Sequence, residues 1–145
     1  TMEFGKSFRS TLPESGNTIL IWNLSRVIDQ NGNYIDYVYK TDNYQLRLHE
    51  IKYTGNLNEG ILPYNNVKFY YNFRDDHNTS YIANTKVKSN YLLHKIVIES
   101  DGSKYKTYEL QYGIKGYSFL NEIIEKGSND GKLNSTLFKY ESDAV

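Results

Sequence analysis

A hairpin signal in the first third of the chain constrains the fold more than any other feature. Residues 22–39 have the sequence Trp-Asn-Leu-Ser-Arg-Val-Ile-Asp-Gln-Asn-Gly-Asn-Tyr-Ile-Asp-Tyr-Val-Tyr, an apolar run, a polar turn and a returning run with alternate tyrosines. An Asn-Gly pair between two such runs favours a tight turn, because the turn needs positive φ at both central residues. We therefore predict a β-hairpin with Asn31 and Gly32 in its turn.

The rest of the chain repeats this arrangement more loosely. Apolar and alternating runs predict strands at residues 18–24, 34–39, 45–54, 66–74, 91–100, 105–112, 117–126 and 134–141. The first of these is apolar on both faces, so we expect it to be covered on both sides. Further turns are predicted at Gly55, Asp101-Gly102 and Gly131, with a polar corner at 75–80. Residues 120–127 also fit a short helix that ends at Gly127.

These runs predict an all-β fold, an antiparallel meander of about eight strands built from repeated hairpins, in a curved sheet or a sandwich. Residues 1–17 are polar and are interpreted as a lead-in arm, and residues 18–145 as a single β domain. The 15 tyrosines and 6 phenylalanines agree with this class, because aromatic side chains favour strands. A chain of 145 residues is long enough for one domain with a core of its own.

The charge balance and the missing residue types exclude several functions. With 17 basic and 17 acidic residues the net charge is zero, which argues against a nucleic-acid surface. The chain has no cysteine, so disulfides and thiolate chemistry are excluded. No apolar run is long enough to span a membrane, and the first residues do not resemble a signal peptide.

One short pattern recurs along the chain. Leucine, two polar residues and a β-branched aliphatic residue occur at 24–27, 48–51, 93–96 and 120–123, and a glycine turn and an aromatic strand follow each time. Recurrence of one supersecondary unit predicts an array whose neighbours stack to bury a shared face. The leucine and the aliphatic residue lie three apart, whereas a flat strand has a period of two. Either a bulge intervenes or the leucine packs on the opposite face.

The same motifs resemble a known family. Trp22-x-Leu-Ser-Arg-x-x-Asp-x-Asn-Gly-Asn-x-Ile-x-Tyr-x-Tyr39 is similar to a unit of the SpvB-type domain, and so are 44–56, 67–76 and 108–112. This domain occurs in the B component of insecticidal Tc toxin complexes and in related bacterial proteins with Rhs (tyrosine-aspartate) repeats. The resemblance covers about residues 20–140. It implies β-strips wound into a shell, so the chain is expected to be a fragment of a much larger repeat protein.

The resemblance also implies a function without catalysis. We expect a structural segment of a secreted or surface-exposed bacterial toxin-like protein involved in virulence. Its expected partners are neighbouring repeats of the parent protein or a toxin-complex subunit, with self-association through free sheet edges as a further expectation. No cofactor is implied by any motif in the sequence.

The polar residues give little support for a catalytic or metal site. Asp29 is interpreted as a cap of the first turn and Asp36 as a solvated residue, not as an acid–base pair. The three histidines, His49, His77 and His94, lack the spacing of a ligand set. Two of them occupy the same repeat position. An Arg-Asp pair within Arg74-Asp75-Asp76 is expected to fix a strand corner, so we predict no catalytic, metal-binding or cofactor-binding residue.

The tyrosines leave an alternative function open, a carbohydrate- or protein-binding β module. Amphipathic rings supply contact area at low entropic cost. The residues considered for such an aromatic surface are Trp22, Tyr37, Tyr39, Tyr70 and Tyr105. The competing interpretation is that these rings form cross-strand pairs within the sheet.

Overall fold

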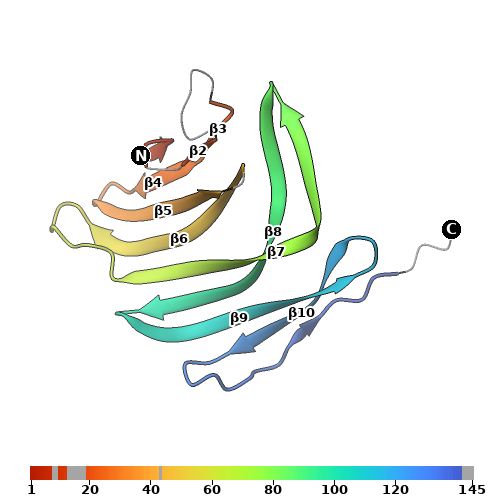
Figure 1. Cartoon of the computed structure of the whole chain (residues 1–145). Coiled ribbons are helices and arrows are strands. Elements are labelled where there is room, and N and C mark those ends of the chain that lie inside the picture. Colours follow the sequence, from red (N-terminus) through yellow and green to blue (C-terminus); the bar gives the residue numbers. More distant parts are fainter. Residues whose placement is uncertain (8–9, 13–18, 43, 142–145) are drawn as a thin grey trace.

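The computed structural model describes residues 1–7, 10–12, 19–42 and 44–141, and this part of the chain contains strands and no helix. The strands are β1 (Met2–Phe4), β2 (Thr11–Leu12), β3 (Ile21–Trp22), β4 (Leu24–Ile28), β5 (Asn33–Asp42), β6 (Gln45–Asn56), β7 (Asn65–Ile82), β8 (Thr85–Ser100), β9 (Ser103–Ile114), β10 (Ser118–Lys126) and β11 (Thr136–Leu137). The predicted all-β meander is confirmed (Figure 1). Of the two expected forms, the curved open sheet is the one observed.

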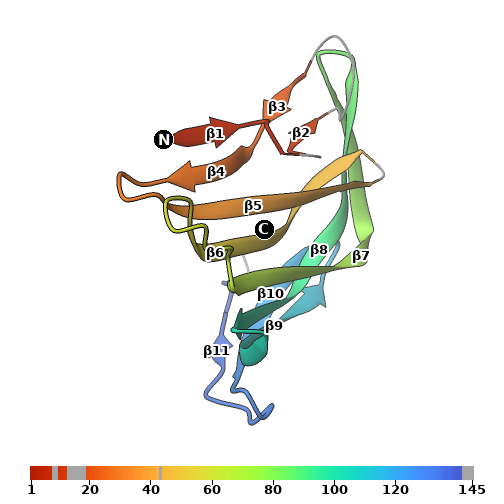
Figure 2. The ribbon, with the colours of Figure 1, turned by 90° about the vertical axis from the view of Figure 1, so that its left-hand side faces the viewer.

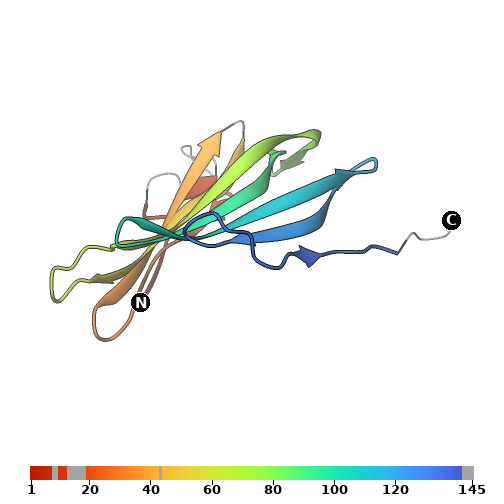
Figure 3. The ribbon, with the colours of Figure 1, turned by 90° about the horizontal axis from the view of Figure 1, so that it is seen from below.

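Nearly all strands belong to one sheet. Its nine strands have the order β1-β4-β5-β6-β7-β8-β9-β10-β11, and each pairs antiparallel with the next. β2 and β3 form a separate two-stranded ribbon beside the N-terminal edge (Figure 2). Seen from below, the strands form a twisted fan, with the N- and C-termini at opposite ends (Figure 3).

Turn chemistry explains the hairpins. In the β4–β5 turn, Gly32 has a φ of 83°, and the Asp29 carboxylate accepts hydrogen bonds from the backbone N–H groups of Asn31 (2.8 Å) and Asn33 (2.9 Å). Asp101 and Gly102 join β8 to β9 with φ values of 48° and 72°. Positive φ at two consecutive residues matches the twist of the flanking strands.

A sharp bend divides β7 and β8 into two halves. Phe73 pairs with Tyr91, and the next pair is Asn78 with Ser89, so residues 74–77 of β7 lie opposite Asn90 alone. Beyond this wide bulge the two strands turn away from the main sheet and stand as a two-stranded arm (Figure 1). The predicted polar corner at 75–80 is therefore a bend within a continuous strand.

The sheet leaves most of its apolar side chains partly exposed. Among the described residues, only Leu12 and Tyr34 are fully buried apolar side chains. The accessible surface is 9685 Å², about 2,000 Å² more than the roughly 7,700 Å² expected for a compact monomer of 16.9 kDa. The excess arises because a single open sheet covers neither of its faces completely.

Several local predictions differ from the structure. Residues 2–4, expected in a lead-in arm, pair with β4 at the edge of the sheet. The run 18–24 is not covered on both sides: Ile21 and Trp22 are exposed, and Thr18 lies outside the described residues. Strand β10 replaces the alternative helix at 120–127. The strand expected at 134–141 is reduced to Thr136–Leu137.

Candidate functional site

The recurring leucine pattern coincides with a recurring β-bulge. In each of the four repeats, one neighbouring strand skips the residue after the leucine, and these bulge residues are Ser25, His49, His94 and Asn121. In the second repeat, Tyr39 lies opposite Leu48 and Tyr37 lies opposite Ile51. Residues two apart on one strand share a face, so the bulge brings a leucine and an isoleucine three apart to the same face. This resolves the alternative left open by the sequence.

The bulges also mark where neighbouring hairpins separate. Pairing of each leucine-bearing strand with the strand that follows it ends two residues after the leucine, at Arg26–Asp36, Glu50–Lys68, Lys95–Glu109 and Glu122–Leu137. Past these points the strands β5–β6, β7–β8 and β9–β10 stay paired within their own hairpins. The sheet is thus continuous at one end and divided into separate hairpins at the other (Figure 1).

A tyrosine hydroxyl bridges each of these separations. It donates a hydrogen bond to the carbonyl oxygen of the repeat leucine, in the pairs Tyr39–Leu24 (3.0 Å), Tyr71–Leu48 (2.7 Å), Tyr112–Leu93 (2.8 Å) and Tyr140–Leu120 (2.8 Å). We call these four bonds the tyrosine ladder. A strand carbonyl that lies beyond the end of the β-pairing needs another hydrogen-bond donor when it is shielded from water, and the hydroxyl supplies one.

The ladder joins consecutive repeats. Tyr39 donates to Leu24 on one side and lies opposite Leu48 of the next repeat on the other. Tyr71 likewise lies opposite Leu93, and Tyr112 opposite Leu120. The β-branched aliphatic residues of the four repeats pair with Ile35, Val67, Tyr108 and Thr136 on the following strands. Each ladder tyrosine lies four residues after the member of this set on its own segment. One tyrosine therefore fixes the spacing of two repeats.

Burial raises the pKa of three of the ladder hydroxyls. Removal from water raises the pKa of Tyr39, Tyr71 and Tyr112, because the phenolate would be poorly solvated there. The Arg47 guanidinium, over the ring of Tyr71, partly opposes this rise in pKa. The neutral phenol is the form that can donate, so the raised pKa values favour these three hydrogen bonds.

Cross-strand ion pairs link neighbouring strands of the main sheet. The nitrogen–oxygen distances are 2.5 Å for Arg26–Asp36, 2.7 Å for Lys68–Glu99, 2.5 Å for Lys106–Glu125 and 2.7 Å for Lys126–Glu109. The bond to Glu99 raises the pKa of Lys68, and the same bond lowers the pKa of Glu99. These pairs are partly exposed, so each contributes little stability but favours one register.

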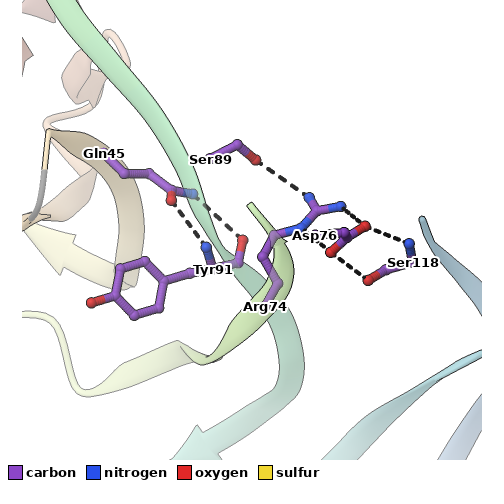
Figure 4. A network of polar contacts seen from close by, with 6 residues as sticks. All are labelled: Gln45, Arg74, Asp76, Ser89, Tyr91 and Ser118. Carbon is purple, nitrogen blue, oxygen red and sulfur yellow. Dashed lines mark hydrogen bonds and ion pairs between the residues drawn. The ribbon is translucent and has the colours of Figure 1, made fainter. Parts of the chain in front are cut away.

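A polar network fixes the bend of β7 (Figure 4). Arg74 donates from Nε and Nη2 to both carboxylate oxygens of Asp76, at 2.7 and 2.6 Å, and from Nη1 to Ser89 at 3.3 Å. The same carboxylate accepts from the backbone N–H and the hydroxyl of Ser118, at 2.5 and 2.8 Å. Arg74, followed by the Ser118 backbone, lowers the pKa of Asp76. The expected Arg-Asp pair is present, and it also ties the bend to the start of β10.

Gln45 holds the other strand of the bend (Figure 4). Its side-chain oxygen accepts from the backbone N–H groups of Asn90 (2.5 Å) and Tyr91 (3.1 Å), where the bulge interrupts the β7–β8 ladder. Asn90 is buried, with 3% of its surface exposed, so its backbone needs such a partner. The Tyr44 carbonyl also accepts from the N–H of Lys88 at 3.0 Å. The tip of the β5–β6 hairpin thus supports the arm.

The predicted turn residues occupy turns, with one exception. Asn31, Gly32, Asp101 and Gly102 lie in the hairpin turns described above, and Gly131 lies in the loop after β10. The predicted turn at Gly55 is wrong, because this residue lies inside β6. A Cβ atom at Gly55 would lie 2.5 Å from the ring of Tyr34, so glycine is needed there for the close approach of that buried ring.

The five residues of the predicted aromatic surface do not converge. Trp22 belongs to the small ribbon and lies against Gly5, and the Tyr39 hydroxyl is engaged in the tyrosine ladder. Tyr37 lies opposite Ile51, whereas Tyr70 lies opposite Lys95, whose ammonium is 4.7 Å from the Tyr70 ring centre. Tyr105 is exposed near the β8–β9 turn. The rings are divided between two sheets and serve different local contacts.

The acidic and imidazole side chains also serve local structure. Asp29 caps its turn as expected, but Asp36 is not simply solvated, because Arg26 binds both of its carboxylate oxygens at 2.5 and 2.8 Å. His49 and His94 are bulge residues, and the His77 ring lies 5.9 Å from the Phe73 ring. In the described ranges, no three histidine or acidic side chains gather as metal ligands would.

Sequence reasoning did not predict the tyrosine ladder. Each tyrosine is 15 to 23 residues from the leucine whose carbonyl it binds, so no local period connects the two. A signal was present: each leucine pattern is followed by an apolar residue, one intervening residue and a tyrosine, at Tyr37-Val-Tyr39, Phe69-Tyr-Tyr71, Leu110-Gln-Tyr112 and Phe138-Lys-Tyr140. Aligning the repeats on both patterns would have revealed it.

These features define a class of protein: an open antiparallel sheet of linked hairpins that leaves apolar surface for neighbours. No known protein family and no curated protein matches the sequence, but solved structures match its fold. The crystal structure of TcdB2-TccC3-TEV matches 97% of this chain and 10% of its own, with a TM-score of 0.79 and 14% identity. The Photorhabdus luminescens Tc holotoxin pore with TccC3-D651A matches 91% of this chain and 9% of its own, with a TM-score of 0.72 and 13% identity.

The N-terminal domain of the effector protein SpvB from Salmonella typhimurium strain LT2 is also similar. It matches 97% of this chain and 58% of its own, with a TM-score of 0.69 and 12% identity. The expected resemblance to the SpvB-type and Tc toxin proteins is therefore confirmed at the level of the fold. This chain spans about a tenth of the Tc toxin chains and little more than half of the SpvB domain. The described residues include no helix long and apolar enough to cross a membrane.

Proposed function

We propose that this chain is a structural segment of a bacterial toxin-related protein, in which its sheet forms part of a β shell or scaffold. The likeness in fold to Tc toxin chains and to the SpvB N-terminal domain supports this role. Its partners are neighbouring repeats of the same protein or another subunit of a toxin complex. The chain acts by shape and stability, and has no catalysis of its own.

The observation that carries the proposal is the uncovered surface. An excess of about 2,000 Å² over a compact monomer is more than twice the roughly 800 Å² that each partner buries in a standard protein–protein interface. The exposed apolar side chains are spread over several strands, and include Phe4, Phe73, Tyr105, Leu137 and Tyr140. The apolar side chains of such a sheet are shielded from water only when adjacent strands or a second layer cover them.

The use of the polar groups supports a role without catalysis. Asp29 caps a turn, Asp36 binds Arg26, and Asp76 binds Arg74 and Ser118. The Arg74 guanidinium lowers the pKa of Asp76, which is unfavourable for a general acid or base near neutral pH.

Unfolding and dye binding of the 145-residue chain test the scaffold role. We expect a β-sheet circular dichroism spectrum together with strong enhancement of anilinonaphthalene sulfonate fluorescence. We also expect a urea m-value below the size average, because less surface becomes newly exposed on unfolding. The urea-unfolded chain is the control for dye binding. A monomer that does not bind the dye and has an m-value typical of its length would contradict the proposal.

We further propose that the parent protein is secreted or displayed on the cell surface, and contributes to virulence. Fractionation of the producing bacterium, with antibodies against this segment, tests the first part. We expect the segment in the medium or accessible to protease on intact cells. A signal confined to lysed cells would contradict it.

A further inference from the structure

The edge of each tyrosine-bearing strand that faces the next repeat, which we call its outer edge, follows one pairing rule. A ladder tyrosine lies opposite the leucine of the next repeat, and the residue two before it lies opposite that repeat's isoleucine. The rule holds at Tyr39–Leu48 with Tyr37–Ile51, Tyr71–Leu93 with Phe69–Ile96, and Tyr112–Leu120 with Leu110–Ile123. In all three cases the partner strand carries one bulge residue between the two pairs.

On its edge that faces β10, the segment 136–140 makes the same contacts as the other tyrosine-bearing strands make with the strand before them. Thr136 pairs with Ile123, and the Tyr140 hydroxyl donates to the Leu120 carbonyl at 2.8 Å, as in the other repeats. Its outer edge, turned away from β10, has no partner strand within the described part of the chain, since β11 is the last strand of the sheet. Phe138 and Tyr140 are 38% and 59% exposed, whereas their counterparts, such as Phe69 and Tyr71, are half-buried.

We propose that the outer edge of the segment 136–140 binds one antiparallel β-strand with the pattern leucine, two polar residues and isoleucine or valine. The leucine lies opposite Tyr140 and the aliphatic residue opposite Phe138, with a one-residue bulge after the leucine. This inference rests on the proposed scaffold function and specifies the partner that the edge accepts.

A second copy of this chain does not satisfy the rule. The β1 strand of another copy carries Met-Glu-Phe and not the leucine pattern. Eight successive antiparallel pairings also make β1 parallel to β11 when the two copies keep the same sheet face on the same side. A second β11 has the antiparallel direction but carries Phe138-Lys-Tyr140, not the leucine pattern. The occupant is therefore a strand of the leucine type.

The bulge makes the recognition specific. In a regular strand without a bulge, leucine and isoleucine three apart point to opposite faces, so the bulge is needed for both of them to reach the apolar side of the edge. The chain offers its own probe in residues 46–54, Leu-Arg-Leu-His-Glu-Ile-Lys-Tyr-Thr, in which His49 is the bulge residue. The matched control is the same peptide with the substitution Ile51→Ser, which removes one of the two aliphatic side chains.

Fluorescence anisotropy with the two labelled peptides and the intact 145-residue chain tests the proposal. We expect the 46–54 peptide to bind at least ~10-fold more tightly than the Ile51→Ser peptide, because burial of one aliphatic side chain is lost. Phe138→Ser should weaken binding of the first peptide by ~10-fold or more. Tyr81→Ser, at a 70% exposed site on the arm, should leave it unchanged.

Equal binding of the two peptides, or no binding of the first, would overturn the proposal. Dimerisation that Phe138→Ser abolishes, without peptide binding, would also overturn it and make a second copy the occupant. The peptide comparison uses the unaltered protein, so it stands even if a variant fails to fold. Dye binding and a low m-value without peptide binding would leave the scaffold function intact and refute the pairing rule alone.

Discussion

Tyr71→Phe removes one hydroxyl from the tyrosine ladder and leaves the ring in place. The lost bond, 2.7 Å long, joins the partly buried Tyr71 hydroxyl to the carbonyl oxygen of Leu48. A neutral hydrogen bond of this kind contributes about 1 kcal/mol net to folding. The carbonyl has no strand partner past the Glu50–Lys68 pair, so we expect the upper part of the usual range, about 1–1.5 kcal/mol. For a domain of this length the melting temperature should fall by about 3–5 °C.

Urea unfolding followed by circular dichroism measures this loss. Tyr39→Phe and Tyr112→Phe should behave like Tyr71→Phe, and Tyr140→Phe should cost less because that residue is 59% exposed. Tyr81→Phe is the matched control, at a 70% exposed position without a ladder bond, and should change stability by less than about 0.5 kcal/mol. If Tyr71→Phe and Tyr81→Phe had equal stabilities, the ladder would not hold the hairpins together.

The ladder also predicts a loss of stability in alkali. The folded state raises the pKa of Tyr39, Tyr71 and Tyr112, so it holds these protons more tightly than the unfolded chain. Their contribution is complete below the unfolded pKa of about 10 and is lost as the pH rises through the folded values. Urea midpoints measured from pH 8 to 11 should therefore decline, and less steeply in Tyr71→Phe. A parallel decline in both proteins would contradict this.

Three further substitutions test other parts of the structure. Gly55→Ala should cost about 1–3 kcal/mol in urea unfolding, because its Cβ would lie 2.5 Å from the ring of Tyr34; a neutral change would refute that contact. His49→Asn should be tolerated within about 0.5 kcal/mol in urea unfolding, since asparagine fills the same bulge position in the last repeat; a larger loss would show that the imidazole itself supports the bulge. The contribution of Asp76 is present above its unfolded pKa of 3.8 and is lost as the pH falls below it, so acid unfolding of Asp76→Asn should depend less on pH than that of the parent. Identical acid profiles would show that the Arg74 pair is not coupled to folding.

The sequence was sufficient to predict most of the long strands of the main sheet and most turns. Alternation in segments such as 66–74 depends on the two faces of one strand, which is a local property. The Asp-Gly turn has positive φ at both residues, whereas the Asn-Gly turn has it at Gly32 alone and not at Asn31 as predicted; this conformational preference is equally local. The family resemblance rested on the order of these local units, and the fold agrees with it.

Features that depend on distant partners were not predictable in the same way. The β7–β8 hairpin turns at Ala83 and Asn84, with φ values of 44° and 63°, and alanine gives no turn signal. Gly55 was assigned to a turn because its reason for being glycine, the ring of Tyr34, lies on another strand. The bend at 74–77 looked like a loop because its polar residues are satisfied by Ser89 and Ser118, which are remote in sequence.

The position of the bulges explains how such a sheet can grow without becoming flat. Each bulge ends the pairing between one hairpin and the next, and the ladder tyrosine replaces the lost pairing by a single hydrogen bond at a fixed position. The hairpins can then diverge while their bases stay in register, which gives the fan seen in Figure 3. Growth by one leucine strand and one tyrosine strand preserves both the antiparallel order and the ladder. A two-stranded repeat, and not a single strand, is therefore the physical unit of this architecture.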